Sequence, residues 1–284
     1  MQLKQAVIVR GRGHHECELK AGVLSIKCMF NGSVLYETPD GRYLVDDSHY
    51  LILNDGQAYR MQKLSDVLSV CVFFPLDWAS DILRASVTPD DALLDNPLQK
   101  QPVHFFETLQ RHGDVASRYM QMIKHLPKTS THIVDKMLHE EFLRDLLHAM
   151  LQSQRNIVRD ATKLPDARPS TRIELLRRLR IARDYLHASY ADALTIDQLA
   201  SVAGLSPYHF IRKFKALFGQ TPHQYLRQVR LEHARTLLLQ TNQSITDICF
   251  AVGFQSLGSF STIFHKQNGL SPRQYRLAHA TSQF

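Results

Sequence analysis

The sequence predicts an α+β protein of two domains: a small β-barrel or sandwich with helices, followed by an all-helical domain. Short β-like runs separated by turn dipeptides fill residues 5–74, whereas helical periodicity dominates after Pro75. A polar segment with two prolines, residues 156–170, is interpreted as a linker. The predicted domains are therefore residues 1–155 and 171–284.

Strands are predicted in the first third of the chain because apolar residues alternate there with other residues. Asn31-Gly32 offers a tight turn after the first clear run, and turn residues also bound the runs Tyr43–Val45 and Tyr50–Leu53. Many short strands with regular turns favour a small barrel or sandwich. The residues in phase before the first turn are Leu24, Ile26, Cys28 and Phe30.

A long helix is predicted from about Ser130 to Arg155, directly before the linker. Its apolar residues form a stripe wider than a two-stranded coiled coil needs. The stripe either covers the β-domain or pairs with the same helix of a second chain, which would make a homodimer. Its members are Ile133, Val134, Met137, Leu138, Phe142, Leu143, Leu146, Leu147 and Met150.

The C-terminal part contains one pattern twice. Residues that recur 49 positions later are Ile196, Leu199, Ala203 and Gly204, matched by Ile245, Ile248, Val252 and Gly253. Residues that recur 50 positions later are Phe210, Phe214, Gly219, Pro222 and Tyr225, matched by Phe260, Phe264, Gly269, Pro272 and Tyr275. Each copy predicts a helix, a glycine turn and a second helix, at about 195–219 and 244–269. This arrangement is the helix-turn-helix that reads the major groove of DNA.

Helix start and stop signals support both copies. Hydroxyl residues precede each predicted helix, and a Gln or Asp three residues after some of them predicts a capping box. Gly204 and Gly253 supply the left-handed residue that ends the first helix of each copy. The expected N-caps are Thr195, Ser206, Thr221, Ser244 and Ser271.

Positive charge gathers in the C-terminal part. Residues 168–284 hold 15 Lys+Arg and 6 Asp+Glu, whereas residues 1–167 hold 19 and 21. A basic helical domain beside a near-neutral domain is the electrostatic pattern of nucleic-acid binding.

Residues 170–280 resemble the DNA-binding domain of the AraC/XylS family of bacterial transcription regulators. The stretches LTIDQLASVAGLSPYHFIRKFKALFGQTPHQYLRQVRLEHARTLL and SITDICFAVGFQSLGSFSTIFHKQNGLSPRQYR carry the resemblance. It implies two helix-turn-helix units joined by a long helix, Pro222–Leu239, with their second helices in successive major grooves. It also implies a cupin-like N-terminal domain that senses a small-molecule effector or mediates dimerisation. Double-stranded DNA is then the partner, with RNA polymerase a further partner if the protein is an activator.

The first reading helix, Ser206–Phe218, presents the main DNA-contacting candidates. Tyr208, Ile211 and Arg212 are expected to face bases, because the apolar residues of this helix occupy its other side. The planar guanidinium of Arg212 can bind both acceptors of a guanine, although a phosphate contact is the open alternative. Lys213 and Lys215 are expected to meet phosphates.

The second reading helix, about Leu257–Gln267, offers weaker candidates. Ser261 and Thr262 are expected to face bases, and His265 and Lys266 to face phosphates. The family commonly has an arginine in place of Thr262 and a lysine in place of His265, so this unit is expected to position the protein more than to specify sequence. The joining helix adds Arg227, Arg230 and Arg235 as phosphate or acidic-residue partners.

Catalysis, metals and cofactors are not expected. The run His14–Glu18 has metal-ligand residue types, but adjacent histidines on a strand point to opposite faces, which favours a polar edge strand. The alternative function is a DNA-repair methyltransferase-like enzyme with the same helix-turn-helix pair, and the sequence lacks the Pro-Cys-His run and cysteine cluster such an enzyme needs.

The remaining features set expectations for location and ligand. Four scattered cysteines predict reduced thiols in a cytoplasmic protein, and no apolar run approaches the roughly 20 residues that span a bilayer. An effector pocket in the β-domain has four candidates, and neither they nor the effector can be decided from the sequence: His49, Tyr50, Tyr59 and Arg60.

Overall fold

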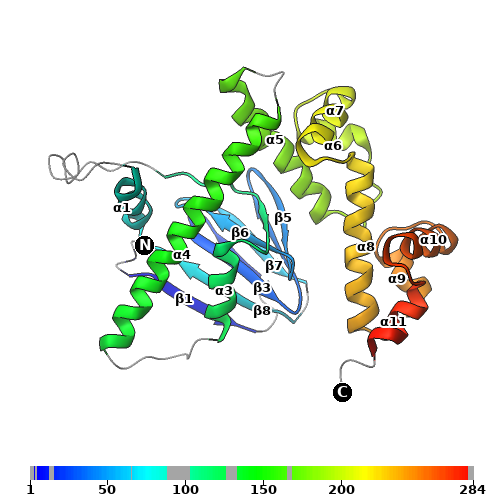
Figure 1. The fold of residues 1–284 in the computed structure, drawn as a ribbon, viewed down its shortest axis with the longest axis horizontal. Coiled ribbons are helices and arrows are strands. Elements are labelled where there is room, and N and C mark those ends of the chain that lie inside the picture. Colours follow the sequence, from blue (N-terminus) through cyan, green and yellow to red (C-terminus); the bar gives the residue numbers. More distant parts are fainter. Residues whose placement is uncertain are drawn as a thin grey trace. The chain divides into compact units, whose positions relative to one another are not determined.

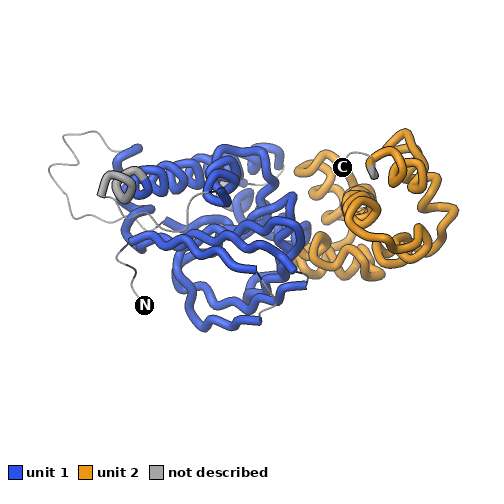
Figure 2. The backbone as a smooth tube through the Cα atoms, turned by 90° about the horizontal axis from the view of Figure 1, so that it is seen from below, with its two compact units in different colours: residues 1–184 blue, residues 185–284 orange. Residues whose placement is uncertain are grey.

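The computed structural model divides the chain into two compact units, residues 1–184 and 185–284 (Figure 2). The first unit combines β-sheets with helices, and the second is helical throughout the residues described. The described residues are 3, 5–12, 16–64, 66–87, 103–125, 133–164 and 168–280.

The strands of the first unit form two antiparallel sheets (Figure 1). One sheet has the order β1-β8-β3-β6-β9 and the other has the order β2-β7-β4-β5. The strands are β1 (Val7–Gly11), β2 (Glu16–Leu19), β3 (Ser25–Phe30), β4 (Val34–Thr38), β5 (Gly41–Val45), β6 (His49–Leu53), β7 (Tyr59–Lys63), β8 (Leu68–Phe73) and β9 (Leu109–Arg111).

The central strand β3 confirms the alternating pattern. Ile26 and Cys28 pack into the apolar core on one face of their sheet, whereas Met29 packs into the core between the sheets. All six residues of β3 are buried, because both faces of its sheet are covered. Asn31 follows with a φ of 62°, the left-handed conformation that a tight turn requires.

The expected cupin-like barrel is not confirmed, because the described strands do not close into one. Strands β1 and β9 end one sheet and β2 and β5 end the other, and no hydrogen-bonded ladder joins these edges. The first unit is therefore a two-sheet arrangement, which corresponds to the sandwich in the prediction. Closure depends on pairing between edge strands far apart in the sequence, so local patterns could not decide it.

Helix α4 covers one face of the larger sheet (Figure 1). Leu146 and Met150 are fully buried in one core with the sheet residues Ile26 and Val72. The covering role of the apolar stripe is therefore confirmed from Phe142 onward, and the side chains of 133–138 lie outside the described residues. The helices before the second unit are α1 (Leu76–Val87), α3 (Val115–His125) and α4 (Ile133–Arg159).

The expected linker, residues 156–170, is largely helical. Helix α4 continues to Arg159, a 3-10 helix spans Asp160–Lys163, and helix α5 (Pro169–Ala188) begins before the segment ends. Leu164 is fully buried, which the polar composition of the segment did not predict. The division between the units falls after Asp184, inside α5.

Helix α5 is attached to the β-strands of the first unit by buried polar groups. Asp184 is fully buried and accepts hydrogen bonds from the Thr108 hydroxyl at 2.6 Å and the Leu109 amide at 3.0 Å. Arg183 pairs with Asp184 and donates to the Leu109 carbonyl at 2.7 Å. Buried charges must be paired, so these contacts explain why most of α5 belongs to the first unit.

The second unit contains the two predicted helix pairs (Figure 1). Its described helices, after the end of α5, are α6 (Ile196–Val202), α7 (Pro207–Phe218), α8 (Pro222–Gln240), α9 (Ile245–Ala251), α10 (Leu257–Asn268) and α11 (Pro272–Ala280). No helix in the described part of the chain has the length and apolar character needed to cross a bilayer.

Candidate nucleic-acid interface and cavities

Helices α6 and α7 form the first helix-turn-helix unit. Phe210, Phe214 and Leu217 of α7 are buried and recur at helical spacing on one side of the helix. The other side of α7 is therefore left to solvent, as the sequence predicted.

The exposed face of α7 carries the predicted base-reading side chains. Tyr208 has 71% of its surface exposed and Ile211 has 37%, although both are large side chains that would otherwise favour burial. Arg212 and Lys215 are exposed beside them, and Lys213 is half-buried. The structure thus places an aromatic ring, an aliphatic side chain and two cations on one helix face.

Helices α9 and α10 form the second unit in the same way. Phe260 and Phe264 are buried on the inner side of α10. On the outer side, the predicted contact residues Thr262, His265 and Lys266 are exposed, whereas Ser261 is half-buried. Lys266 brings the one formal charge among the predicted contact residues of α10, so this face is less basic than that of α7.

The aromatic packing shows that the sequence repeat is a structural repeat. The rings of Phe210 and Phe214 lie 5.4 Å apart, and those of Phe260 and Phe264 lie 5.6 Å apart. Phe214 meets Tyr225 edge-on at 5.8 Å, and Phe264 meets Tyr275 edge-on at 5.4 Å. Two ring contacts of the reading helix therefore recur in both units.

Most of the predicted helix caps are present. Thr195 and Thr221 form reciprocal capping boxes with the glutamines three residues on, and Ser271 exchanges the same two hydrogen bonds with Gln274. Ser206 occupies its expected N-cap position but makes no side-chain cap hydrogen bond.

The capping box expected at Ser244 is only half formed. Ser244 accepts from the Asp247 amide at 3.0 Å, but the Asp247 carboxylate binds the Ser244 hydroxyl at 2.7 Å and not its backbone amide. Aspartate is one carbon shorter than the usual glutamate or glutamine, which explains the difference.

Arg230 has a structural role that the sequence did not reveal. It was expected to contact phosphate or an acidic residue, but it donates to the Tyr190 carbonyl at 2.8 Å and the Asp192 carbonyl at 2.9 Å. Burial lowers the pKa of Arg230. Arg276 in α11 holds the loop before the second unit in the same manner, through the Leu238 and Gln243 carbonyls. No local signal distinguished these arginines from the exposed Arg227.

The charge of α5 belongs mainly to the first unit. Residues 168–184 hold 6 Lys+Arg and 2 Asp+Glu, and residues 185–284 hold 9 and 4. Arg180 pairs with Asp160 at 2.7 Å, and burial lowers the pKa of Arg180 to about 10. The second unit remains basic, with a net charge of +5, but part of the C-terminal excess stabilises the first unit instead of facing a ligand.

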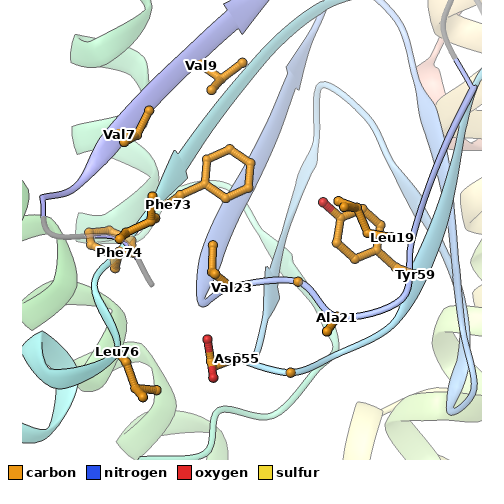
Figure 3. A pocket seen from close by; sticks show the side chains of 13 residues that line it. Val7, Val9, Leu19, Ala21, Val23, Asp55, Tyr59, Phe73, Phe74 and Leu76 are labelled. Atoms are coloured by element: carbon orange, nitrogen blue, oxygen red, sulfur yellow. The ribbon is translucent and has the colours of Figure 1, made fainter. Parts of the chain in front are cut away.

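A cavity in the first unit opens between the sheets and is mostly apolar (Figure 3). Its volume is about 540 Å³, and Val7, Val9 and Phe73 line one side of it while Leu19 and Tyr59 line the other. Of the four pocket residues considered from the sequence, Tyr59 alone lines this cavity.

Lys27 lies behind the wall of this cavity. Its ammonium nitrogen is 3.8 Å from the ring centroid of Phe73 and 5.3 Å from that of Tyr59. Lys27 has only 1% of its surface exposed, and burial lowers its pKa. The aromatic faces partly compensate a charge that has no carboxylate partner in the described ranges.

Three of the four cysteines are buried, and residues of the acidic run form the edge strand that the sequence predicted. Cys28, Cys71 and Cys249 are buried, and burial raises the pKa of Cys28 and of Cys249. Glu16–Leu19 form β2, the edge of the smaller sheet, while His14 and His15 lie outside the described residues.

The chain is similar to known DNA-binding regulators. Residues 199–278 match a protein family described as a helix-turn-helix domain. The bifunctional transcriptional activator/DNA repair enzyme AdaA of Bacillus subtilis (strain 168) is 38% identical over 93 residues, which are 33% of this chain and 44% of AdaA. The HTH-type transcriptional activator RhaS of Yersinia pestis bv. Antiqua (strain Angola) is 29% identical over 227 residues, which are 72% of this chain and 77% of RhaS.

A solved structure from Chromobacterium violaceum, a transcriptional regulator described as an AraC-type DNA-binding domain-containing protein, is also similar. It is 34% identical with a TM-score of 0.35, and the match covers 36% of this chain and 92% of that one. The first curated relatives are matched over less than half of their own length, 44% and 38% for the first two.

Proposed function

We propose that this chain, which belongs to the AraC/XylS family of transcription regulators, controls transcription by binding specific sites on double-stranded DNA. The observation that carries the proposal is the duplicated helix-turn-helix with an outward face on each reading helix. A regulator needs both a DNA-reading surface and a domain that regulates DNA binding. The first unit supplies this regulatory domain.

Helix α7 is the principal sequence reader in this proposal. Arg212 binds a guanine edge, and Tyr208 and Ile211 contact bases through apolar surface such as a thymine methyl. Lys213 and Lys215 neutralise phosphates and make binding dependent on salt. The exposure of Tyr208 and Ile211 supports this division of roles, because packing alone would favour burial of both side chains.

Helix α10 positions the protein more than it reads sequence. Ser261 and Thr262 meet bases with short side chains that cannot bind a guanine in two places, and His265 and Lys266 meet phosphates. The exposed Gly258 adds no side chain to this face.

The sharpest test compares Arg212→Ala with Thr262→Ala. We expect Arg212→Ala to weaken binding to a footprinted operator by about 1–3 kcal/mol and to affect random DNA much less. Thr262→Ala is expected to cost less on the same operator. Fluorescence anisotropy at fixed salt measures both, with Gln267→Ala as an exposed control on α10.

Two outcomes would contradict this assignment. Equal losses on operator and random DNA would make Arg212 a phosphate contact. A larger loss for Thr262→Ala would make α10 the principal reader.

The proposal extends to an effector, a cellular location and further partners. The first unit senses a small molecule, which the similarity to the RhaS activator over both units supports. The protein acts in the cytoplasm as an activator that contacts RNA polymerase. A second copy of the chain is a further partner, but pairing through Leu143 and Leu147 would require exposing residues that are buried in the single chain.

An enzymatic role is not favoured. The match to the AdaA activator and repair enzyme involves 33% of this chain, and the helix-turn-helix family match lies at residues 199–278. A methyl-accepting thiolate must be reachable and activated, whereas Cys28 and Cys249 are fully buried and have raised pKa values.

A further inference from the structure

A second cavity of the first unit lies beside α5 and is smaller than the apolar cavity in Figure 3. Its volume is about 260 Å³, near the lower end for small-molecule sites. Strand β5, the segment 104–107 and helix α5 supply its wall. The lining residues are Asp40, Tyr43, His104, Phe105, Phe106, Glu107, Ile173, Arg177 and Ile181.

Glu107 lines this cavity with a carboxylate of which one oxygen alone is hydrogen-bonded to described residues. Its Oε1 accepts hydrogen bonds from the Asn54 amide at 3.0 Å and from Asn54 Nδ2 at 2.9 Å. Its Oε2 is buried and has no hydrogen-bond partner in the described part of the chain. Burial raises the pKa of Glu107, against the effect of the Asn54 hydrogen bonds. A buried carboxylate oxygen without a donor is costly unless a ligand or solvent supplies one.

Tyr43 brings a second unmatched group. The residue is fully buried, and its hydroxyl makes no hydrogen bond within the described residues. The nearby Thr38 hydroxyl is already bonded to the amides of Asp40 and Gly41. Burial, and then the charges of Asp184 and Glu107, raise the pKa of Tyr43 against a lowering effect of the Thr38 hydroxyl on the phenol oxygen, so the phenol keeps its proton and can donate.

His104 also lines the cavity; its Nε2 lies 3.4 Å from Asn54 Nδ2, and its charge opposes the rise in the pKa of Glu107. The rest of the cavity is apolar at its wall and charged at its rim. Ile173 and Ile181 of α5 give an aliphatic surface. Arg177 and Asp40 pair with each other at 3.1 Å, and each has 45% of its side chain exposed. The rim pair is therefore balanced in charge, whereas the half-buried Glu107 has no ion pair with a described residue.

We propose that this cavity binds a small organic ammonium ion that also carries an oxygen acceptor. The ammonium group donates to Glu107 Oε2, and the acceptor receives the hydrogen bond of the Tyr43 hydroxyl. A short aliphatic group packs on Ile173 and Ile181. Such a ligand compensates both unmatched groups at once and supplies the missing positive charge.

The position of the cavity gives the ligand a regulatory role. Three lining residues are on α5, the helix in which the division between the two units falls. A ligand that contacts α5 can favour one arrangement of this helix on its unit. Where DNA binding also prefers one arrangement, ligand and DNA change each other's affinity by the same factor. This regulatory step rests on the proposed function, whereas ligand binding itself does not.

Four probes of matched shape test the ligand chemistry on the full chain. Valinol and L-valine carry an ammonium group, whereas 3-methylbutane-1,2-diol and 2-hydroxy-3-methylbutanoate replace it with a hydroxyl. We expect at least one ammonium probe to raise the melting temperature in a saturable way and the two hydroxyl probes to leave it unchanged. Valinol and valine then distinguish a simple amine from an amino acid. Equal effects of the diol and valinol would overturn the proposal.

Two variants connect binding to the named atoms. Glu107→Gln keeps an acceptor for Asn54. It is expected to weaken binding of the ammonium probe by about tenfold or more, which corresponds to the loss of a charged hydrogen bond. Tyr43→Phe is expected to weaken it by about fivefold. Tyr43→Phe removes an unmatched hydroxyl, and Glu107→Gln replaces an unmatched charged oxygen with a neutral amide nitrogen, so the melting temperature without probe should not fall. Glu140→Gln, at an exposed site of α4, is the control. Unchanged affinity in Glu107→Gln would overturn the assignment.

Anisotropy with a footprinted operator separates the two proposals. We expect the ammonium probe to change operator affinity of the wild type at least twofold and to leave Glu107→Gln unaffected. Probe binding without any effect on operator affinity would overturn the regulatory role. A chain that binds the probe but prefers no DNA sequence would instead contradict the proposed function, and the cavity assignment would stand.

Discussion

Gly253 shows how one residue fixes the turn of the second helix-turn-helix unit. Its φ is +88°, and an added Cβ would lie 2.7 Å from the Ala191 carbonyl oxygen and 3.0 Å from the Arg230 guanidinium. Gly219 has a similar φ of +75° but open space around it. The two glycines therefore separate the cost of backbone strain from the cost of a collision with the loop that Arg230 holds.

We expect Gly253→Ala to lower the free energy of unfolding by about 3 kcal/mol and Gly219→Ala by about 1 kcal/mol. The smaller loss is backbone strain alone, and the larger includes displacement of a backbone carbonyl. Urea denaturation of the full chain, followed by circular dichroism, measures both. Equal losses would show that the loop before α6 moves away freely.

Lys27 predicts a pH dependence of stability. Its folded pKa is lowered by burial, whereas the unfolded chain keeps the ordinary value of 10.5. Between the two values the unfolded state binds more protons, so the free energy of unfolding rises with pH in that window. Below the folded pKa both states hold the proton, and this contribution is flat.

Lys27→Met should remove this rise and be at least as stable as the wild type near neutral pH, because it removes a buried charge without an ion pair. Urea midpoints from about pH 7 to about pH 10 measure the difference between the two proteins. Comparing the variant with the wild type cancels the shared titration of buried tyrosines and cysteines. Parallel curves would mean that Lys27 does not titrate in this range.

At the scale of elements, the apolar stripe of α4 could serve as a cover for the sheet or as a dimer interface, and only the packing of the folded chain distinguishes the two roles. Leu147 is fully buried in the core that joins α4 to the larger sheet. We expect Leu147→Ala to cost about 2–5 kcal/mol through the cavity it leaves. Gln152→Ala, at an exposed position of α4, should change stability by less than about 0.5 kcal/mol.

Sedimentation of the same variants distinguishes core from interface. A covering helix predicts that the folded Leu147→Ala protein keeps the wild-type oligomeric state. Loss of a dimer with little loss of stability would instead show that the stripe pairs two chains.

At the scale of the whole molecule, the first unit depends on residues beyond the predicted boundary at 155. Ile157, Ala161 and Leu164 are buried, and Asp184 holds Thr108 of the same unit. We therefore expect a fragment of residues 1–188 to resist urea better than a fragment of residues 1–155. Coincident unfolding midpoints would show that α5 adds no stability and would favour the boundary predicted from composition.

The sequence by itself determined the features that depend on neighbours along the chain. Alternation placed β3, Phe210 and Phe214 defined the inner side of α7, and the internal repeat placed the second unit. These patterns span a few residues or follow from the likeness of one segment to its copy. They can therefore be recognised without knowledge of the tertiary contacts.

Only the tertiary structure decided the features that depend on distant partners. The boundary inside α5 follows from Asp184 meeting Thr108, which is 76 residues away. The unmatched oxygen of Glu107 is recognisable only because Asn54, 53 residues away, occupies the other oxygen. Arg230 differs from Arg227 through carbonyls on a separate loop. Burial and pairing of polar groups are set by which segments meet in space, and no local pattern of residues records that choice.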